Sequence, residues 1–495
     1  MFCERTVTAG PARPARDDMA EVLLVNSNRL RPAVAPLGLD YAADVLRSRG
    51  LEVRLLDLCF ERDVEAAVQR ALGEREPALV GVTLRNTDDC YMASARDFVP
   101  GFAELIAAIR RYTDVPVVIG GSGFSVCPEA VLEATGADFG IAGDGEMPLA
   151  MLADAVCTGA SPNRVPGLVW WEDGVPRRNA PWSGPLDDLP RRERRLVDNE
   201  RYFAEGGQAG IETKRGCDRG CIYCADPLGK GRRVRPRAPA QVADEFEVLL
   251  GRGVDHFHLC DSEFNVPVEH AHAVCEELIR RGIGERARWY TYATPAGFTC
   301  ALAKAMRRAG CVGVNFGVDS ACDAMLASLG RDFTLEDIQL TAHACRAAGL
   351  VFMYDLLLGG PGETRTSVAE TIEAMKQISP CRVGVSLGIR IYAGTELSRR
   401  VAAEGPMAEN RSLRGAVHEN PGLRKPVFYL SADLGEDAES YVAGLVGGDR
   451  RFFFPTADAG TDAYNYSDND RLVQAIAAGY RGAYWDILRL LSEGA

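Results

Sequence analysis

Short apolar runs alternate with segments of helical periodicity from residue 21 onward. Residues 21–28 (EVLLVNSN) are typical of a buried parallel strand, and residues 36–50 repeat apolar positions three and four apart before ending at a glycine. The alternation continues to about residue 160, with further strands expected at 51–58, 78–86, 115–123 and 137–146. This rhythm predicts a doubly wound, Rossmann-like parallel sheet, in which ligands bind beyond the carboxyl ends of the strands.

A second series of strands and helices follows from residue 211 to about 400. Its six strands are expected within residues 211–216, 254–265, 288–295, 311–322, 351–364 and 382–397. Six repeats are fewer than the eight of a closed barrel, so this α/β unit is predicted as a partial (β/α)6 barrel.

The remaining segments lack this rhythm. Residues 1–19 read as a flexible tail, and residues 161–210 as a hairpin with an Asp173-Gly174 turn and a linker. Residues 401–495 are predicted to form a small C-terminal domain, either a cap over the barrel mouth or a structural extension. The predicted domains are therefore 20–160, 211–400 and 401–495.

Composition narrows the class of protein. The 495 residues carry 56 Lys and Arg against 69 Asp and Glu, a net charge of −13, which is unfavourable for wrapping a nucleic-acid backbone. Neither a signal sequence nor an apolar run long enough for a membrane span is visible. Fifteen cysteines in a chain of this size do not indicate a disulfide framework, so we expect a cytoplasmic protein in a reducing compartment.

Three of these cysteines carry the strongest chemical signal. Cys217, Cys221 and Cys224 have C-x3-C-x2-C spacing at the end of the first strand of the second series. Thiolates suit iron–sulfur clusters and zinc, and three of them on a four-iron cubane leave one iron open. A zinc knuckle is the alternative, but a fourth Cys or His at knuckle spacing is absent.

The stretch resembles the cluster-binding loop of radical S-adenosylmethionine (SAM) enzymes, including the aromatic Tyr223 before the last cysteine. The resemblance implies a [4Fe–4S] cluster whose open iron chelates SAM. The segments GVDSAC and GGPGET, residues 317–322 and 359–364, also resemble elements of that family. SAM-binding residues implied in this way are Tyr223, Asp261, Glu263, Asp319 and Arg390.

Residues 20–160 resemble the cobalamin-binding domain that precedes many radical SAM barrels. The cobalamin-binding positions carried over are Pro36, Leu37, Gly38, Gly120, Gly121, Gly143, Gly145 and Glu146. Domains that ligate cobalt through histidine carry D-x-H-x-x-G, but no histidine occurs in the first 250 residues here. We therefore expect Arg85 or Asn86 to approach the lower face of the corrin without ligating cobalt, with a structural ion pair as the alternative for Arg85.

The two resemblances together imply a cobalamin-dependent radical SAM methyltransferase. It would pass a methyl group from SAM through methylcobalamin, loaded as hydroxocobalamin, to an unactivated carbon or phosphorus of a small molecule in natural-product or antibiotic biosynthesis. An external donor of flavodoxin or ferredoxin type and a monomeric state are also expected. Alternatives are cyclisation or rearrangement without net methylation, a methylthiotransferase, and a non-catalytic cobalamin or redox sensor; which residues are catalytic stays unknown.

Overall fold

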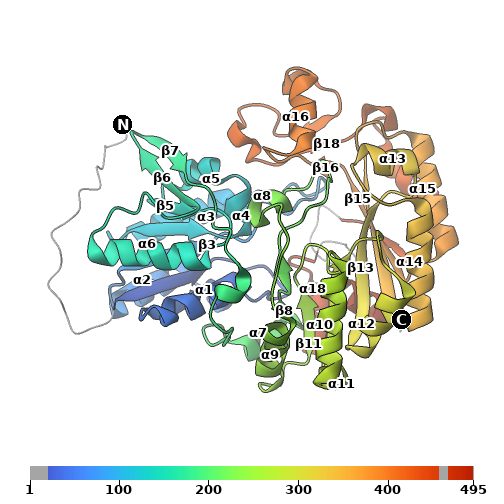
Figure 1. The fold of residues 1–495 in the computed structure, drawn as a ribbon. Coiled ribbons are helices and arrows are strands. Elements are labelled where there is room, and N and C mark those ends of the chain that lie inside the picture. Colours follow the sequence, from blue (N-terminus) through green and yellow to red (C-terminus); the bar gives the residue numbers. More distant parts are fainter. Residues whose placement is uncertain (1–19, 456–465, 494–495) are drawn as a thin grey trace.

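Two parallel sheets, each with its own helices, make up most of the molecule. The computed structural model describes residues 20–455 and 466–493, so the expected tail at 1–19 lies outside the described residues. Figure 1 shows the N-terminal sheet in blue and teal beside the larger second sheet in green to orange. The α/β class and the order of the two units predicted above are confirmed.

The N-terminal sheet has the strand order β2-β1-β3-β4-β5-β6-β7. β1 to β5 are parallel, and β6 and β7 form the antiparallel hairpin predicted around Asp173 and Gly174. Its strands are β1 (Glu21–Asn26), β2 (Glu52–Asp57), β3 (Leu79–Thr83), β4 (Val117–Gly120), β5 (Phe139–Ile141), β6 (Leu168–Glu172) and β7 (Val175–Arg178). Its helices are α1 (Leu37–Ser48), α2 (Val64–Glu74), α3 (Val99–Arg110), α4 (Ser122–Val126), α5 (Pro128–Thr135) and α6 (Glu146–Thr158).

The second sheet contains six parallel strands, the predicted number, and one more. The first of them ends at Ile211, where the predicted strand 211–216 begins, and Lys214 and Arg215 belong to a separate antiparallel pair of strands. The order of the second sheet is β19-β15-β14-β13-β12-β11-β8, so each β/α repeat adds the next strand on the same side. The strands are β8 (Ala209–Ile211), β11 (His256–Leu259), β12 (Arg288–Ala293), β13 (Cys311–Asp319), β14 (Val351–Leu358), β15 (Arg382–Leu387) and β19 (Phe452–Phe453). The helices are α9 (Pro239–Leu250), α10 (Val268–Arg280), α11 (Ile283–Arg286), α12 (Cys300–Arg308), α13 (Asp323–Ser328), α14 (Leu335–Ala348) and α15 (Arg365–Ile378).

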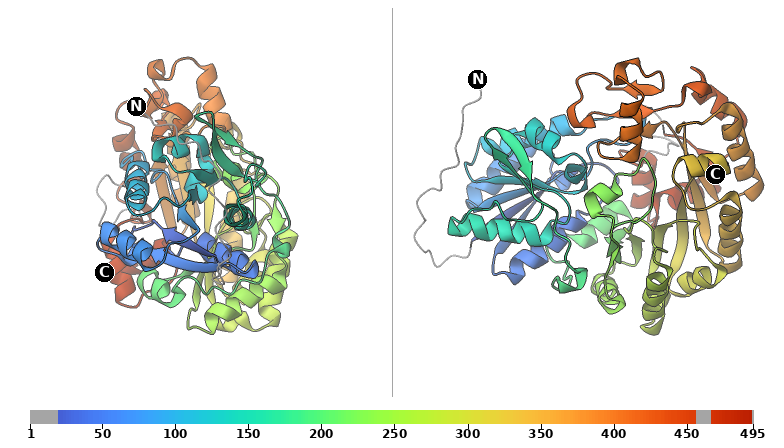
Figure 2. Two further views of the ribbon diagram at one scale, coloured as in Figure 1. Left: turned by 90° about the vertical axis from the view of Figure 1, so that its left-hand side faces the viewer. Right: turned by 45° about the horizontal axis from the view of Figure 1, so that its top comes forward.

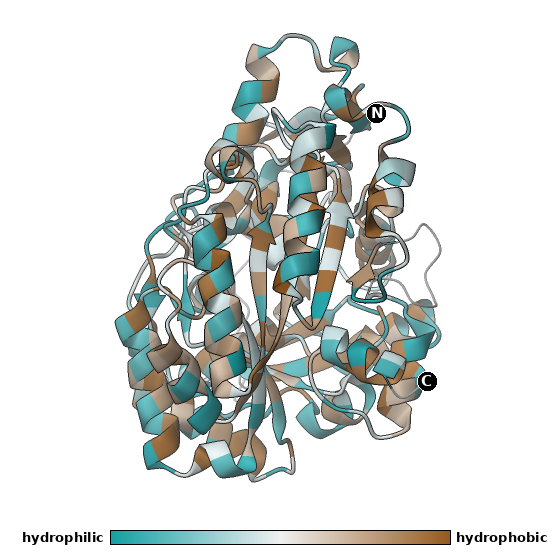
Figure 3. Ribbon diagram, turned by 90° about the vertical axis from the view of Figure 1, so that its right-hand side faces the viewer, coloured by the Kyte–Doolittle hydropathy of each residue, from teal (hydrophilic) through white to brown (hydrophobic). Residues whose placement is uncertain are grey.

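Side chains along these strands point alternately to the two faces of the sheet, and the apolar ones identify the face that packs into the core. Val314, Phe316, Phe352, Tyr354 and Leu356 belong to the large apolar cluster that the surrounding helices cover. The residues between them therefore point to the concave side, toward the N-terminal domain. Figure 3 shows the covering helices with both hydrophilic and hydrophobic residues along their length, as expected for helices with one buried side.

The C-terminal residues contribute at several places. A three-stranded sheet of β16 (Ile389–Arg390), β18 (Val427–Tyr429) and β17 (Leu413–Gly415) stands with α16 (Glu396–Ala403) above the junction of the two large sheets (Figure 2). β19 extends the second sheet itself, an addition that the sequence pattern did not predict. The remaining helices are α17 (Ala438–Val446), α18 (Asp470–Ala477) and α19 (Tyr484–Glu493). None of the helices in the described parts of the chain has the length and apolarity that a membrane span requires.

A buried ionic group joins the two large units. Arg194, in the linker, donates to the carboxylates of Asp40 on α1 and Glu245 on α9 at 2.8 Å each, and all three side chains are fully buried. Its guanidinium also donates to Gly210 O on β8. Burial alone would raise the pKa of Glu245, but Arg237 and Arg194 lower it below its usual range.

We expect Arg194→Met to lower the free energy of unfolding by about 3–5 kcal/mol, because it leaves two carboxylates buried without their shared cation. The neighbouring Arg195 is the matched control. Its side chain is 67% exposed and pairs only with Glu193, so Arg195→Met should change stability by less than about 0.5 kcal/mol. Denaturant unfolding of the three proteins measures both, and equal losses would contradict this role for Arg194.

Candidate functional site

The cysteine loop lies between β9 (Lys214–Arg215) and α8 (Asp226–Lys230). Cys217 is buried, and Cys221 and Cys224 are half-buried. The loop rests on the turn after α13, where Ile222 N donates to Leu329 O at 3.0 Å. Gly330 adopts a φ of 73°, and a Cβ there would lie 2.4 Å from Gly220 O, so only glycine allows this approach.

Burial affects the ionisation of the three thiols in this loop. It raises the pKa of Cys221 to about 11 and also raises the pKa of Cys217 and Cys224, which favours the neutral thiols. Coordination to iron would favour the thiolate form. Among residues 20–455 and 466–493, no three His, Cys, Asp or Glu side chains converge as ligands of one metal ion.

Arg331, between α13 and α14, is the charged group that reaches this loop. Its side chain is 6% exposed, and its Nη1 donates to the Sγ of Cys221 at 2.9 Å. It also donates to Gly317 O on β13 and lies 3.4 Å from Oδ2 of Asp319. A buried cation in contact with a thiolate stabilises the anionic form of the sulfur.

Two predicted carboxylates lie beside Arg331. Tyr223 donates its hydroxyl to Oδ2 of Asp319 at 2.5 Å, and Glu263 Oε1 lies 4.0 Å from an Arg331 nitrogen. Burial raises the pKa of Glu263 to about 7, with Arg331 opposing that shift, and its buried Oε2 has no hydrogen-bond partner among the described residues. The structure thus gathers Tyr223, Glu263 and Asp319 next to the cysteine loop.

Asp261 and Arg390 have internal partners. Asp261 is buried and accepts from Thr213 N, Thr213 Oγ1 and Lys214 Nζ, which fixes the strand end before the loop. Arg390 on β16 pairs with Asp88 of the N-terminal domain at 3.0 Å and donates to the backbone carbonyls of Ile391, Leu423 and Arg424. Both side chains therefore hold the frame around the loop together.

The predicted cobalamin positions line the carboxyl edge of the N-terminal sheet. Space is open beside Gly38 and Gly145, where an added Cβ would meet nothing within 4 Å. Gly121 is different, because its φ is 102° and a Cβ would lie 2.5 Å from Leu84 O. Pro36 and Leu37 begin α1, Gly120 ends β4, and Gly143 follows β5.

Charged and polar groups also lie at this edge. After β3, Arg85 is exposed and Asn86 is half-buried, and the described part of the first 250 residues contains no imidazole. Glu146, in contrast, is buried and forms a bidentate pair with Arg215, whose Nη1 lies 2.9 Å from Oε2. Burial would raise its pKa, but Arg215 lowers it to about 2, so Glu146 joins the two domains as an anion.

Residues 84–98, which follow β3, cross from the N-terminal domain into the mouth of the second sheet. Tyr91 packs against a cluster that contains Tyr290, Met353 and Trp485. Cys90 Sγ lies 3.0 Å from the Tyr392 hydroxyl. One loop thus contacts both the N-terminal domain and the concave side of the second sheet.

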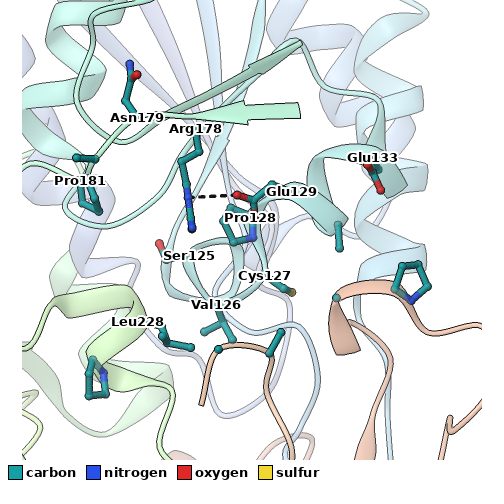
Figure 4. Close-up of a pocket in the computed structure, with 17 residues that line it drawn as sticks. Ser125, Val126, Cys127, Pro128, Glu129, Glu133, Arg178, Asn179, Pro181 and Leu228 are labelled. Carbon is teal, nitrogen blue, oxygen red and sulfur yellow. Dashed lines mark ion pairs between the residues drawn. The ribbon is translucent and has the colours of Figure 1, made fainter. Parts of the chain in front are cut away.

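A cavity of about 720 Å³ lies at the outer margin of this junction (Figure 4). Helices α4 and α5, strand β7, helix α8 and residues 393–394 and 421–422 line it. Arg178 and Glu129 pair across it at 3.2 Å. Its lining includes none of the predicted site residues, so it is separate from the space beside the cysteine loop.

Three further residues near the site were not identified from the sequence. Arg331 stands in a turn without a motif, Tyr91 lies in a loop, and Asp355 sits mid-strand in an apolar run. Of these three, only Asp355 could have been singled out from the sequence, because a carboxylate within an otherwise apolar strand is uncommon and often has a functional role.

Comparison with known proteins agrees with the two units. The sequence model of the radical SAM superfamily matches residues 211–375, and that of the B12 binding domain matches residues 25–153. The tryptophan 2-C-methyltransferase of Streptomyces laurentii is 29% identical, over 94% of this chain and 95% of that protein.

Solved structures extend the likeness to the whole chain. The radical SAM methyltransferase TsrM of Kitasatospora setae, solved with tryptophan and a SAM analogue, is 32% identical, with a TM-score of 0.89 over 96% of this chain and 98% of that one. A second structure of that enzyme, with cobalamin and a [4Fe–4S] cluster, gives 30% identity and a TM-score of 0.88 over the same shares. On this evidence the chain belongs to the cobalamin-dependent radical SAM methyltransferases.

Proposed function

We propose that this enzyme methylates C2 of the indole ring of tryptophan. Methyl transfer from SAM to an unactivated atom of a small molecule is the chemistry of its family, and its Streptomyces laurentii relative is a tryptophan 2-C-methyltransferase. Cyclisation has weaker support, because the anaerobic magnesium-protoporphyrin IX monomethyl ester cyclase of Rubrivivax gelatinosus is 26% identical over 70% of this chain, against 94% for the tryptophan methyltransferase.

One feature of the site supports an aromatic substrate. Tyr292 on β12 is 41% exposed although its neighbours Thr291 and Ala293 are buried, so its ring faces the space between the sheets. His258 on β11 meets that ring edge-on at 5.0 Å, and burial lowers the pKa of this histidine to about 4, so it stays neutral. Neutral aromatic walls favour a flat apolar ring such as indole.

We assign the cofactors to the chain's own residues as follows. Cys217, Cys221 and Cys224 would hold the [4Fe–4S] cluster, with Tyr223, Glu263 and Asp319 beside the SAM site. Gly38, Gly120, Gly145, Arg85 and Asn86 would border cobalamin. When bound, cobalamin supplies a methyl carrier and the cluster supplies a binding site for SAM. The protein orients the substrate ring between the sheets and excludes water.

The decisive experiment is an anaerobic reaction of the reconstituted enzyme with SAM and tryptophan deuterated at indole C2. We expect a product heavier by one methyl group that has lost this deuterium, because the new bond replaces the C2–deuterium bond. Mass spectrometry reads both changes. A methylated product that keeps the deuterium would place the methyl group elsewhere, and the absence of any methylated tryptophan would exclude this substrate.

Cys217→Ala should lower the iron content and the product yield together, because only two thiolates would remain to hold the cluster in the protein. Cys157 is the matched control, since it is an exposed free cysteine on α6. Cys157→Ala should keep the iron content and the rate of the wild type. Iron analysis and product mass spectrometry measure both, and normal iron in the Cys217 variant would remove that residue from the ligand set.

Arg331→Met should lower iron retention or product formation by about 10- to 100-fold, the usual cost of removing a partner of a metal ligand. Arg331→Lys keeps the charge and should recover part of this loss. Arg219 lies in the cysteine loop but pairs with Asp218 and Asp332, so Arg219→Met serves as the control. If both methionine variants behaved alike, a specific role for the Arg331–Cys221 contact would be refuted.

The surroundings of the reaction complete the proposal. We expect a monomer in the reducing cytoplasm, supplied with electrons by a flavodoxin or ferredoxin. The acidic chain and its small-molecule family give no support to a nucleic-acid partner.

A further inference from the structure

Three adjacent strands place polar side chains on the concave side of the second sheet. In the parallel register, Tyr292 on β12 stands opposite Asn315 on β13, and Gly317 stands opposite Asp355 on β14. Their strand neighbours Phe316, Tyr354 and Leu356 face the helices and belong to the apolar core. Tyr292, Asn315 and Asp355 thus share one surface, toward the N-terminal domain.

Asn315 and Asp355 are joined in a defined orientation. The Nδ2 of Asn315 donates to Oδ2 of Asp355 at 2.7 Å. Because a carboxylate can only accept, this contact fixes the amide nitrogen toward Asp355 and the amide oxygen away from it. That oxygen is buried, Asn315 is 3% exposed, and no described residue donates to Oδ1.

A buried acceptor without a donor is costly in a protein built for stability alone. The carboxylate of Asp355 adds negative charge at the same place, and its field helps to raise the pKa of Tyr91 and Tyr292, with burial as the larger cause for each. An amide oxygen that lacks a donor, next to a carboxylate, favours a ligand that brings N–H donors and positive charge.

The same surface is accessible and aromatic. Tyr292 exposes 41% of its surface, so a ligand can reach this side of β12. Tyr91 brings a second ring from the N-terminal domain to the cluster around Met353, the residue opposite Asn315. Acceptors and aromatic rings thus lie on the same side of the second sheet.

We infer that Asp355 and Asn315 form the binding site for the ammonium group of the substrate, and that the adjoining aromatic walls hold its ring. A primary ammonium carries three N–H donors, which match the carboxylate and the unused amide oxygen in number and charge. This inference rests on the proposed function for the identity of the ring. The ammonium site itself depends only on the residues named here.

Equilibrium binding to the enzyme loaded with cluster and cobalamin, without SAM so that no turnover occurs, tests the inference. Three ring-matched probes are compared by calorimetry: tryptophan, tryptamine, which keeps only the ammonium, and 3-(indol-3-yl)propanoate, which keeps only the carboxylate. In the wild type we expect tryptamine to bind at least about 30-fold more tightly than the propanoate, the lower bound for truncating a buried charge pair.

Asp355→Asn should remove most of that preference, because it should lower the affinity for tryptophan and tryptamine but not for the propanoate. Asp355→Glu should retain part of the preference. Asn315→Ala should weaken tryptamine and spare the propanoate, which tests the amide oxygen separately. The exposed Asp433 provides the carboxylate-to-amide control, Asp433→Asn. Iron content and the cobalamin spectrum of each variant show whether the site remains assembled.

Parallel losses for tryptamine and the propanoate, or an unchanged preference in Asp355→Asn, would overturn the ammonium site, as would a wild type that binds no ammonium probe. The proposed function fails in a different way. If the wild type leaves tryptophan unmethylated but its tryptamine preference still depends on Asp355, the substrate assignment is wrong and the ammonium site stands. In the reverse case, the wild type methylates tryptophan but its preference for tryptamine does not depend on Asp355. The proposed function then stands and the ammonium site is wrong.

Discussion

The ionic group around Arg194 is the constraint on which the site depends. Neither large sheet contains a complete site, because the open glycines belong to one sheet and the cysteine loop to the other. Asp40, Arg194 and Glu245 bury opposite charges from the first domain, the linker and the second domain at a single point. A buried charge tolerates little displacement from its partner, so this group sets the relative position of the two domains to within hydrogen-bond geometry.

A second pair lies close to the first, since the guanidinium carbons of Arg194 and Arg215 lie 5.7 and 5.9 Å from the centroid of the Tyr41 ring. Glu146 begins α6 beside the glycine-containing edge, and Arg215 directly precedes the cysteine loop. Their bidentate contact links the two cofactor regions by one pair of side chains. Glu146 is also one of the residues predicted to border cobalamin, and the structure shows it paired with Arg215 directly before the loop that carries the cysteines.

Much of this architecture could be predicted from local patterns. Apolar runs such as residues 21–26 and 311–318 predict buried parallel strands, and the spacing of Cys217, Cys221 and Cys224 predicts a cluster site with one open iron. Contacts between distant residues could not be predicted in this way. Arg331 reaches Cys221 across 110 positions, and Arg390 reaches Asp88 across 302, so neither pairing leaves a periodic trace. β19 could not be predicted because a strand of two residues has no pattern of its own and forms only by pairing with β15.

Residues 84–98 restrict how the two domains can be exchanged between related proteins. One loop supplies both Arg85 at the edge of the N-terminal sheet and Tyr91 against the interior of the second sheet. A protein that received its N-terminal domain from another enzyme would therefore also receive another residue at the position of Tyr91, against the second sheet. Chimeras of the two domains have to keep residues 84–98 matched to the second sheet that they contact.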